Sequence, residues 1–223
     1  ATAHFQVGFD SSGDSPVAYG GHSAETINYV SCHDDLSLVD KLRASAPEGM
    51  TEEELVRFDK LAQTVVLTAQ GIPSLFAGEE MLRTKGGVSN SHDSPDRVNR
   101  IDWSFKADHK DVFDYYRGLI ALRRTHPAFR LATAAEIERH LRFLDTGDTH
   151  VVAYRLVDHA GGDPWREILV VYNGARAEKR VRIPPGDWHA VCLDGRIASE
   201  ALAVFSGDSV PVPASSALIA YLP

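Results

Sequence analysis

The chain has 223 residues, 43% of them hydrophobic, so it can bury a sizeable core and is long enough for two domains. It carries 31 Asp and Glu against 23 Lys and Arg. The resulting net charge of -8 excludes a long-range field that would draw the chain to nucleic acid or anionic lipid. No apolar run approaches the roughly 20 residues of a membrane span. Two cysteines, Cys32 and Cys192, are too few for a disulfide framework or a metal site, and we expect free thiols.

The first half of the chain alternates between strand and helix patterns. Residues 1 to about 24 lack periodicity and predict a surface loop. Residues 26–31 are rich in β-branched and aromatic side chains and predict a strand, which ends where the charged pair His33-Asp34 begins. Such a position at the C-terminal end of a barrel strand faces a catalytic mouth.

Helix signals follow this first strand. Thr51 with Glu54 has the form of a capping box, and apolar residues at helical spacing continue to about residue 69. Gly71 ends that helix, and residues 74–77 predict a short buried parallel strand. A second amphipathic helix runs from about residue 112 to 126. The strand-helix-strand-helix order predicts a parallel α/β assembly.

Beyond about residue 129 the pattern changes to short β-prone runs separated by turn sequences. The predicted strands are residues 141–144, 151–157, 168–172, 181–183, 190–193 and 217–222. Turn sequences such as Pro184-Pro185-Gly186 and Asp194-Gly195 lie between them. This pattern predicts an antiparallel β-sandwich.

Three motifs follow one another in the first half. They are residues 27–34 (Ile-Asn-Tyr-Val-Ser-Cys-His-Asp), residues 71–80 beginning Gly-Ile-Pro, and residues 82–103 with Arg-Thr-Lys-Gly-Gly at 83–87. Together they resemble the α-amylase superfamily of glycoside hydrolases, and more narrowly the type I pullulanases. The resemblance implies that residues 1–128 form the C-terminal part of a (β/α)8 TIM barrel, with strands seven and eight. Residues 129–223 would then form the antiparallel β-sandwich that follows the barrel.

The resemblance also assigns the candidate catalytic residues. In the family, the His-Asp pair contacts the sugar ring that is distorted during cleavage, so Asp34 and His33 inherit that role. Hydrogen bonds to ring hydroxyls that strengthen in the transition state lower the barrier to hydrolysis. Two residues are expected to support the pair: Glu80 by hydrogen bonds behind the site, and Asp35, which stands where pullulanases commonly have Asn.

A polar loop supplies the candidate substrate-binding residues. Asp96, Asn99 and Arg100 fall in the family's sugar-contacting segment, and the alternative is a solvated polar loop. No metal site and no cofactor are expected, although a calcium ion in a full-length enzyme stays open. The expected partners are an α-glucan and the upstream part of the same enzyme, with no nucleic acid and no membrane.

The sequence lacks part of the machinery for cleavage. A retaining glycosidase needs two carboxyl groups about 5 to 5.5 Å apart, and the family supplies them from barrel strands four and five. Neither motif is present, and a complete barrel takes about 250 residues. We therefore expect the C-terminal part of a longer enzyme that hydrolyses α-1,6-glucosidic linkages in pullulan, glycogen or starch, inactive by itself. Asp10, considered as a displaced nucleophile, lacks a preceding strand and a neighbouring arginine.

Two alternatives stay open: a glycogen debranching enzyme of the isoamylase type, and a non-catalytic glucan-binding or assembly module. Trp165 and Trp188 are expected to serve packing rather than to act as sugar platforms, and Trp103 likewise. Histidines without metal-ligand spacing are read as surface groups: His109, His126, His140 and His150. A partial barrel would also expose an unpaired strand edge, so self-association is expected.

Overall fold

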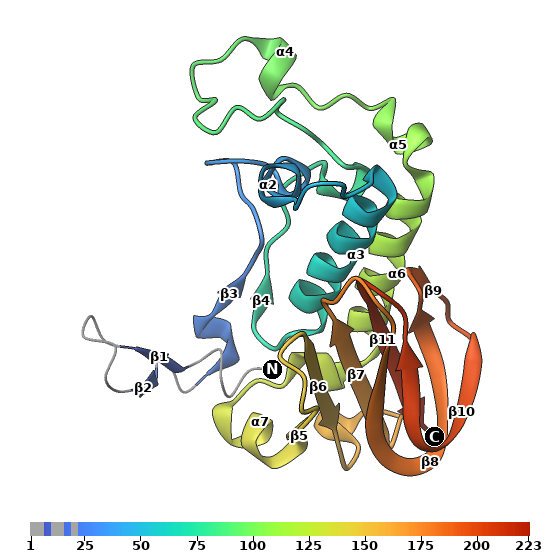
Figure 1. Ribbon diagram of the computed structural model, residues 1–223. Helices are drawn as coiled ribbons and strands as arrows, with labels where there is room; N and C mark the ends of the chain where they lie inside the picture. The colour runs from blue at the N-terminus through green and yellow to red at the C-terminus, as the bar shows by residue number, and fades with distance from the viewer. Residues whose placement is uncertain (1–6, 10–15, 19–21) are drawn as a thin grey trace.

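The computed structural model describes residues 7–9, 16–18 and 22–223 (Figure 1). Strands β1 (Val7–Phe9) and β2 (Pro16–Ala18) pair antiparallel, so part of the expected N-terminal loop is a short ribbon. The 3-10 helix η1 (Ser23–Glu25) follows it. Among the described residues, no helix is both long and apolar enough to cross a membrane.

The expected strand-helix-strand order is present in the first half. Strand β3 (Ile27–Asn28) pairs in parallel with β4 (Ile72–Pro73), and helices α2 (Leu38–Ser45) and α3 (Glu52–Thr68) connect them. The two strands pair only with each other, and each is two residues long. The predicted buried strand at 74–77 is wrong, because these residues continue without strand pairing and are mostly exposed.

The two predicted helices of this half are confirmed. Thr51 caps α3, with its side chain accepting from the Glu54 amide and the Glu54 carboxylate accepting from the Thr51 amide. Helix α6 (Lys110–Thr125) ends directly before His126 and Pro127. Shorter elements lie around these helices: η2 (Glu79–Met81), α4 (Asp96–Asn99), α5 (Phe105–Asp108), η3 (Pro127–Arg130), α7 (Ala134–His140) and η4 (Ala160–Gly162).

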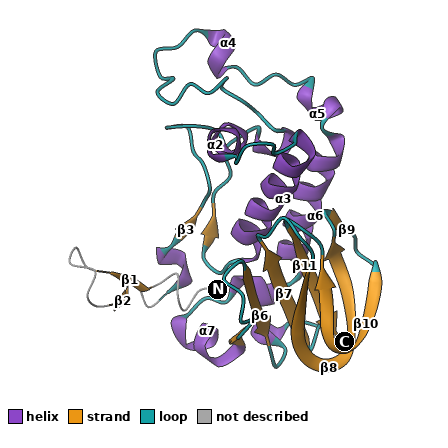
Figure 2. Ribbon diagram, in the orientation of Figure 1, coloured by secondary structure: helices purple, strands orange, loops and turns teal. Residues whose placement is uncertain are grey.

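The second half is a single antiparallel sheet of seven strands (Figure 2). Its members are β5 (Leu141–Leu144), β6 (Val151–Leu156), β7 (Glu167–Asn173), β8 (Lys179–Leu193), β9 (Arg196–Ile197), β10 (Ala203–Val212) and β11 (Ser216–Leu222). The order is β10-β8-β11-β7-β6-β5, with β9 on β8. The antiparallel prediction is confirmed, but the expected turn at Pro184-Pro185-Gly186 is wrong because β8 runs through it.

Buried side chains lie on both faces of this single sheet, and the predicted β-sandwich stays a prediction. On one face, Tyr154, Val170 and Ile219 pack with residues of α3 and α6. On the other face, Trp188 lies fully buried in a second cluster, formed by side chains of β6, β7, β8, β10 and β11. The first cluster therefore contains side chains from both sides of residue 128, and the division into 1–128 and 129–223 stays a prediction.

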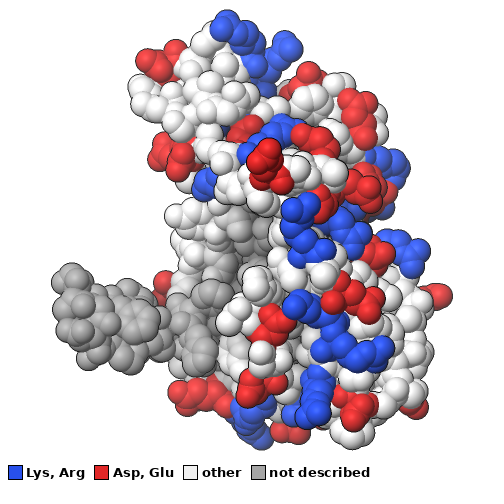
Figure 3. Space-filling model, in the orientation of Figure 1, with Lys and Arg blue, Asp and Glu red and all other residues white. Residues whose placement is uncertain are grey.

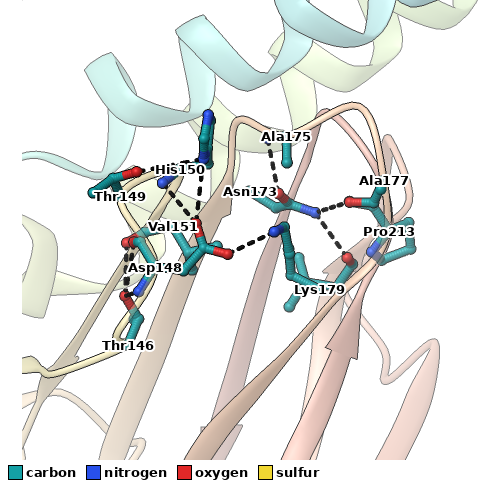
Figure 4. A network of polar contacts seen from close by, with 11 residues as sticks. Thr146, Asp148, Thr149, His150, Val151, Asn173, Ala175, Ala177, Lys179 and Pro213 are labelled. Atoms are coloured by element: carbon teal, nitrogen blue, oxygen red, sulfur yellow. Dashed lines mark hydrogen bonds and ion pairs between the residues drawn. The ribbon is translucent and has the colours of Figure 1, made fainter.

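A buried asparagine closes the upper end of the sheet (Figure 4). The Asn173 amide donates to the carbonyl oxygens of Ala177 at 2.9 Å and of Val212 and Pro213 at 3.0 Å each. Asp148 lies beside it and accepts from Lys179 at 2.6 Å. That contact lowers the pKa of Asp148 to about 2. These bonds fix the turn between β7 and β8 against the end of β10.

Two of the expected surface histidines are buried. His126 is 6% exposed and lies 2.9 Å from an Asp163 carboxylate oxygen, and its ring stacks on Trp165. His140 pairs with the Val157 carbonyl oxygen. The surface prediction failed for them because the Nδ1 atom of each ring has a partner that only the fold brings close. His150 is exposed, as expected.

The tryptophans divide between core and surface. Trp188 is fully buried, so its packing role is confirmed. Trp165 stacks on Tyr221 at 4.0 Å between ring centroids, in addition to its stack with His126. The packing expected of Trp103 is not observed, because 68% of its surface is exposed.

Candidate active-site segment

The predicted catalytic pair lies in the loop that follows β3. The His33 and Asp34 side chains are 83% and 82% exposed, and His33 Nε2 lies 3.4 Å from Asp34 Oδ2. Their carboxylate and imidazole offer hydrogen-bond acceptors and donors to a ligand on the open side of the loop. The structure thus places both groups where a polar substrate can reach them.

Asp35 shapes this loop through its backbone. Its φ of 61° lies in the left-handed region, which Asp tolerates better than most residues because its short side chain can bond locally. The Asp35 carboxylate accepts from the Leu36 amide at 2.9 Å. The left-handed residue turns the chain from the exposed pair toward the buried start of α2.

The segment after β4 contributes two neighbouring carboxylates with different surroundings. Glu80, the predicted supporting residue, accepts from the Gly78 amide at 2.9 Å. Glu79 is 3% exposed and accepts from the Ser31 hydroxyl and from Gln63 Nε2. The contact toward the His33-Asp34 loop is therefore made by Glu79, and the role assigned to Glu80 stays a prediction.

The predicted sugar-contacting residues lie on the loop around α4, which extends beyond the helices (Figure 1). Asn99 donates to the carbonyl oxygens of Ser91 at 2.6 Å and Ser94 at 3.2 Å, so its amide holds the loop together. The Asp96 carbonyl oxygen accepts from the Arg100 amide, which closes α4. Asp96 and Arg100 are exposed.

Arg100 lines a shallow pocket of about 280 Å³ together with Arg83 and Lys85. Lys85 Nζ in turn donates to the His33 carbonyl oxygen at 3.1 Å. Lys85 therefore lines the same pocket as Arg100 and also contacts the backbone of the predicted catalytic pair. None of the described hydrogen bonds or ion pairs joins Asp96, Asn99 or Arg100 to Asp34 directly.

Two buried carboxyl groups lie behind the segment. Burial raises the pKa of Glu79 to about 6, although three hydrogen bonds to its carboxylate oppose the shift. Burial also raises the pKa of Asp59 on α3 to about 8, and the Tyr116 hydroxyl donates to it at 2.7 Å. Asp59 therefore holds a proton at neutral pH, because desolvation outweighs the Tyr116 hydrogen bond and the attraction of Lys60.

Sequence reasoning missed Glu79, Asp59 and Lys85. The strand-end position of Gly78-Glu79-Glu80 indicated a carboxylate near the site, but it could not tell which of the two points inward. No sequence signal indicated that Asp59 or Lys85 would be buried, because charged residues are rarely fully buried. These three residues form hydrogen bonds with partners that are 16 to 57 positions away in the sequence, so no local pattern indicated the contacts.

No group of three or more His, Cys, Asp or Glu side chains in the described part of the chain could hold a metal ion. Cys32 and Cys192 are free, as expected. Asp10 lies outside the described residues. Acidic and basic side chains are interspersed over the face drawn in Figure 3, and no broad basic patch is visible on that face.

Comparison with known proteins shows which family has this arrangement of loop, helices and sheet. The family model described as "Pullulanase, all-beta domain" matches residues 137–196. A pullulanase from Bacillus subtilis strain 168 is 40% identical over 161 residues, covering 72% of this chain and 22% of the relative. The structure of the pullulanase from Bacillus acidopullulyticus matches with a TM-score of 0.87 and 45% identity, over 90% of this chain and 24% of that one. The chain is a homologue of pullulanases.

A second pullulanase structure, the type I enzyme of Bacillus subtilis complexed with maltose, matches with a TM-score of 0.86 and 33% identity. It covers 92% of this chain and 28% of that one. An isoamylase from Flavobacterium sp is a weaker match, with 29% identity over 150 residues. The chain thus spans about a quarter of the length of the pullulanases it matches.

The pullulanase all-beta match begins within α7 and ends at β9. The structural match extends over 90% of the chain and therefore includes residues outside the all-beta match. The β half, for which the sequence offered no motif of its own, is the part that the family model identifies.

Proposed function

We propose that this chain is part of a longer debranching enzyme that hydrolyses α-1,6-glucosidic linkages in pullulan, glycogen or starch with retention of configuration. The observation that carries the proposal is the exposed His33-Asp34 pair in the loop after β3, within a chain homologous to pullulanases. In this proposal, β3 and β4 are strands seven and eight of a (β/α)8 barrel, and the seven-stranded sheet is the domain that follows it.

In this proposal the site residues bind the sugar units around the scissile bond. Asp34 accepts hydrogen bonds from hydroxyls of the sugar ring at the scissile bond, and His33 contacts the same ring. Asp96, Asn99 and Arg100 bind neighbouring sugar units from the polar loop. The nucleophile and the acid/base lie upstream, so the chain by itself binds glucan without cutting it. The structure of a relative complexed with maltose supports an α-glucan as the ligand.

A chimaeric enzyme tests the catalytic role. The segment of Bacillus subtilis pullulanase that matches this chain is replaced by the chain itself, and reducing-sugar release from pullulan is measured. We expect the chimaera to release maltotriose and the 223-residue chain alone to release none. Asp34→Asn should abolish most of the chimaera's activity, whereas Asp108→Asn, which changes an exposed carboxylate of α5 outside the polar loop, should leave it intact.

Two outcomes would count against the proposal. An active Asp34→Asn chimaera would remove Asp34 from the catalytic site. Release of maltotriose by the chain alone, sensitive to Asp34→Asn, would mean that the catalytic carboxylates lie within these residues. Faster hydrolysis of glycogen than of pullulan by the chimaera would favour the isoamylase-type alternative.

A further inference from the structure

The loop that carries the catalytic pair lacks support from its own backbone. Among the described residues, no backbone-backbone hydrogen bond involves residues 29–36, between the end of β3 and the start of α2. The side chains of His33 and Asp34 are also largely solvent-exposed. A loop with exposed side chains and no ladder bonds is expected to move, yet catalytic groups must be held in place to act.

Three side chains from outside this loop hold it instead. Lys41 Nζ on α2 donates to the Val30 carbonyl oxygen at 3.0 Å, and Lys85 Nζ donates to the His33 carbonyl oxygen at 3.1 Å. Glu79 accepts from the Ser31 hydroxyl. Each of the three comes from a different element: α2, the loop after η2, and η2 itself.

The lysine at 85 is fixed in turn by a buried carboxylate. Lys85 is only 2% exposed, and its backbone amide donates to Asp40 at 2.7 Å. Asp40 is 4% exposed and also accepts from the hydroxyls of Ser37 and Thr84. These hydrogen bonds outweigh burial and lower the pKa of Asp40 below its usual range. A charged acceptor with three donors is a strong anchor for the Lys85 backbone. The buried Lys85 ammonium is held by its own bonds to the carbonyl oxygens of His33 and Ser89.

From these contacts we propose that Lys41, Glu79 and Lys85 are positioning residues, which hold the backbone of residues 30–33 and thereby the His33-Asp34 pair. We call the three side chains the clamp. The inference rests on the proposed function for its catalytic meaning. The clamp acts through the loop and touches no substrate. Two of its members, Lys41 and Lys85, donate to backbone carbonyl oxygens and therefore fix the chain whatever the side chains of the loop do.

The backbone order of the 223-residue chain tests the clamp without any glucan. We expect NMR order parameters of about 0.85 at residues 33 and 34, and values below about 0.6 in Lys85→Met and in Lys41→Met. Lys41→Arg should keep the order parameters of the unmodified chain, because Lys41 is half-exposed and has room for a guanidinium donor. Lys110→Met is the matched control, since that lysine forms an exposed ion pair within α6.

Order parameters already below about 0.6 in the unmodified chain, or unchanged in the folded Met variants, would overturn the clamp. If Lys85→Met fails to fold, the half-exposed Lys41→Met decides the question. In the chimaeric enzyme, Lys85→Met is expected to lower kcat on pullulan by about tenfold or more, with a smaller change in KM. Lower order with unchanged kcat would also overturn the positioning role. An inactive unmodified chimaera would contradict the proposed function and leave the order measurement to judge the clamp.

Discussion

At the scale of single residues, buried acids set how this protein responds to pH. Asp59 is 1% exposed, and its carboxyl accepts from the Tyr116 hydroxyl. It faces Glu79 and, from its own helix, Lys60. Desolvation outweighs these partners and keeps the carboxyl protonated in the folded chain, whereas the unfolded chain releases the proton above about pH 4.

The consequence is a stability that falls as pH rises. The pKa of Asp59 is raised from 3.8 to about 8, so its favourable contribution is complete below about pH 4 and is lost as pH approaches 8. The pKa of Glu79 is raised from 4.5 to about 6, so Glu79 adds to the loss of stability only in the lower part of that pH range. Between pH 6.5 and 7.5 the unfolding free energy should fall by up to about 1.4 kcal/mol through Asp59.

Asp59→Asn tests this fall in the unfolding free energy, because the Asn amide is similar in shape to the carboxyl group but does not titrate. Urea unfolding at pH 6.5 and pH 7.5 should show a smaller decline in the variant than in the unmodified chain. Asp108→Asn, at an exposed position of α5, is the control and should keep the full decline. Parallel declines in all three chains would show that Asp59 ionises normally.

At the scale of elements, helices α3 and α7 begin with the same capping motif. Thr51 starts α3 and Thr133 starts α7, and each forms a capping box with the Glu three residues later. The Thr hydroxyl accepts from the Glu amide and the Glu carboxylate accepts from the Thr amide, which satisfies two donors that would otherwise lack partners. Helix α3 spans 17 residues and packs into the core, whereas α7 spans seven.

Removing the caps should destabilise the whole fold. Thr51→Ala and Thr133→Ala are each expected to lower the free energy of unfolding by about 0.5 to 2 kcal/mol. Thr51→Ser keeps the hydroxyl and should stay within a few tenths of the unmodified value. Equilibrium urea unfolding followed by circular dichroism measures all three. Equal stability of Thr51→Ala and Thr51→Ser would show that the hydroxyl bond contributes nothing.

At the scale of the whole molecule, the parallel pair β3-β4 is the uncovered part of the fold. It is a two-stranded sheet, and apolar side chains in and next to it are exposed: Ile27 at 63%, Tyr29 at 57%, Ile72 at 46% and Leu75 at 36%. By contrast, the seven-stranded sheet has a cluster of buried side chains on each face. Two strands alone are marginally stable, and an exposed apolar edge promotes pairing with other chains.

We therefore expect the 223-residue chain to self-associate through β3 and β4. Sedimentation at tens of micromolar should show species larger than a monomer, and Ile27→Lys or Ile72→Lys should shift the distribution toward monomer. Ile120→Lys changes an exposed apolar residue of α6 and should leave the distribution unchanged. A monomeric unmodified chain at these concentrations would contradict the expectation.

The sequence by itself determined the elements whose signals are local. The capping box and helical spacing located α3, the Pro after His126 located the end of α6, and alternating β-prone runs predicted an antiparallel half. It also drew attention to the His33-Asp34 pair, because a strand-like run and a charged dipeptide are adjacent in the chain, and the role of the pair stays a prediction. The missed helix α7 had a usable signal, since Thr133 and Glu136 form a capping box like that of α3.

Only the tertiary structure decided which polar groups are buried and what they hold. Glu79 rather than Glu80 points toward the loop, Lys85 reaches the His33 backbone across 52 residues, and β8 continues through Pro184-Pro185-Gly186 instead of turning. The physical reason is the same in each case. The free energy of a buried charge or a bent strand depends on partners supplied by distant segments, and a local pattern carries no record of those partners.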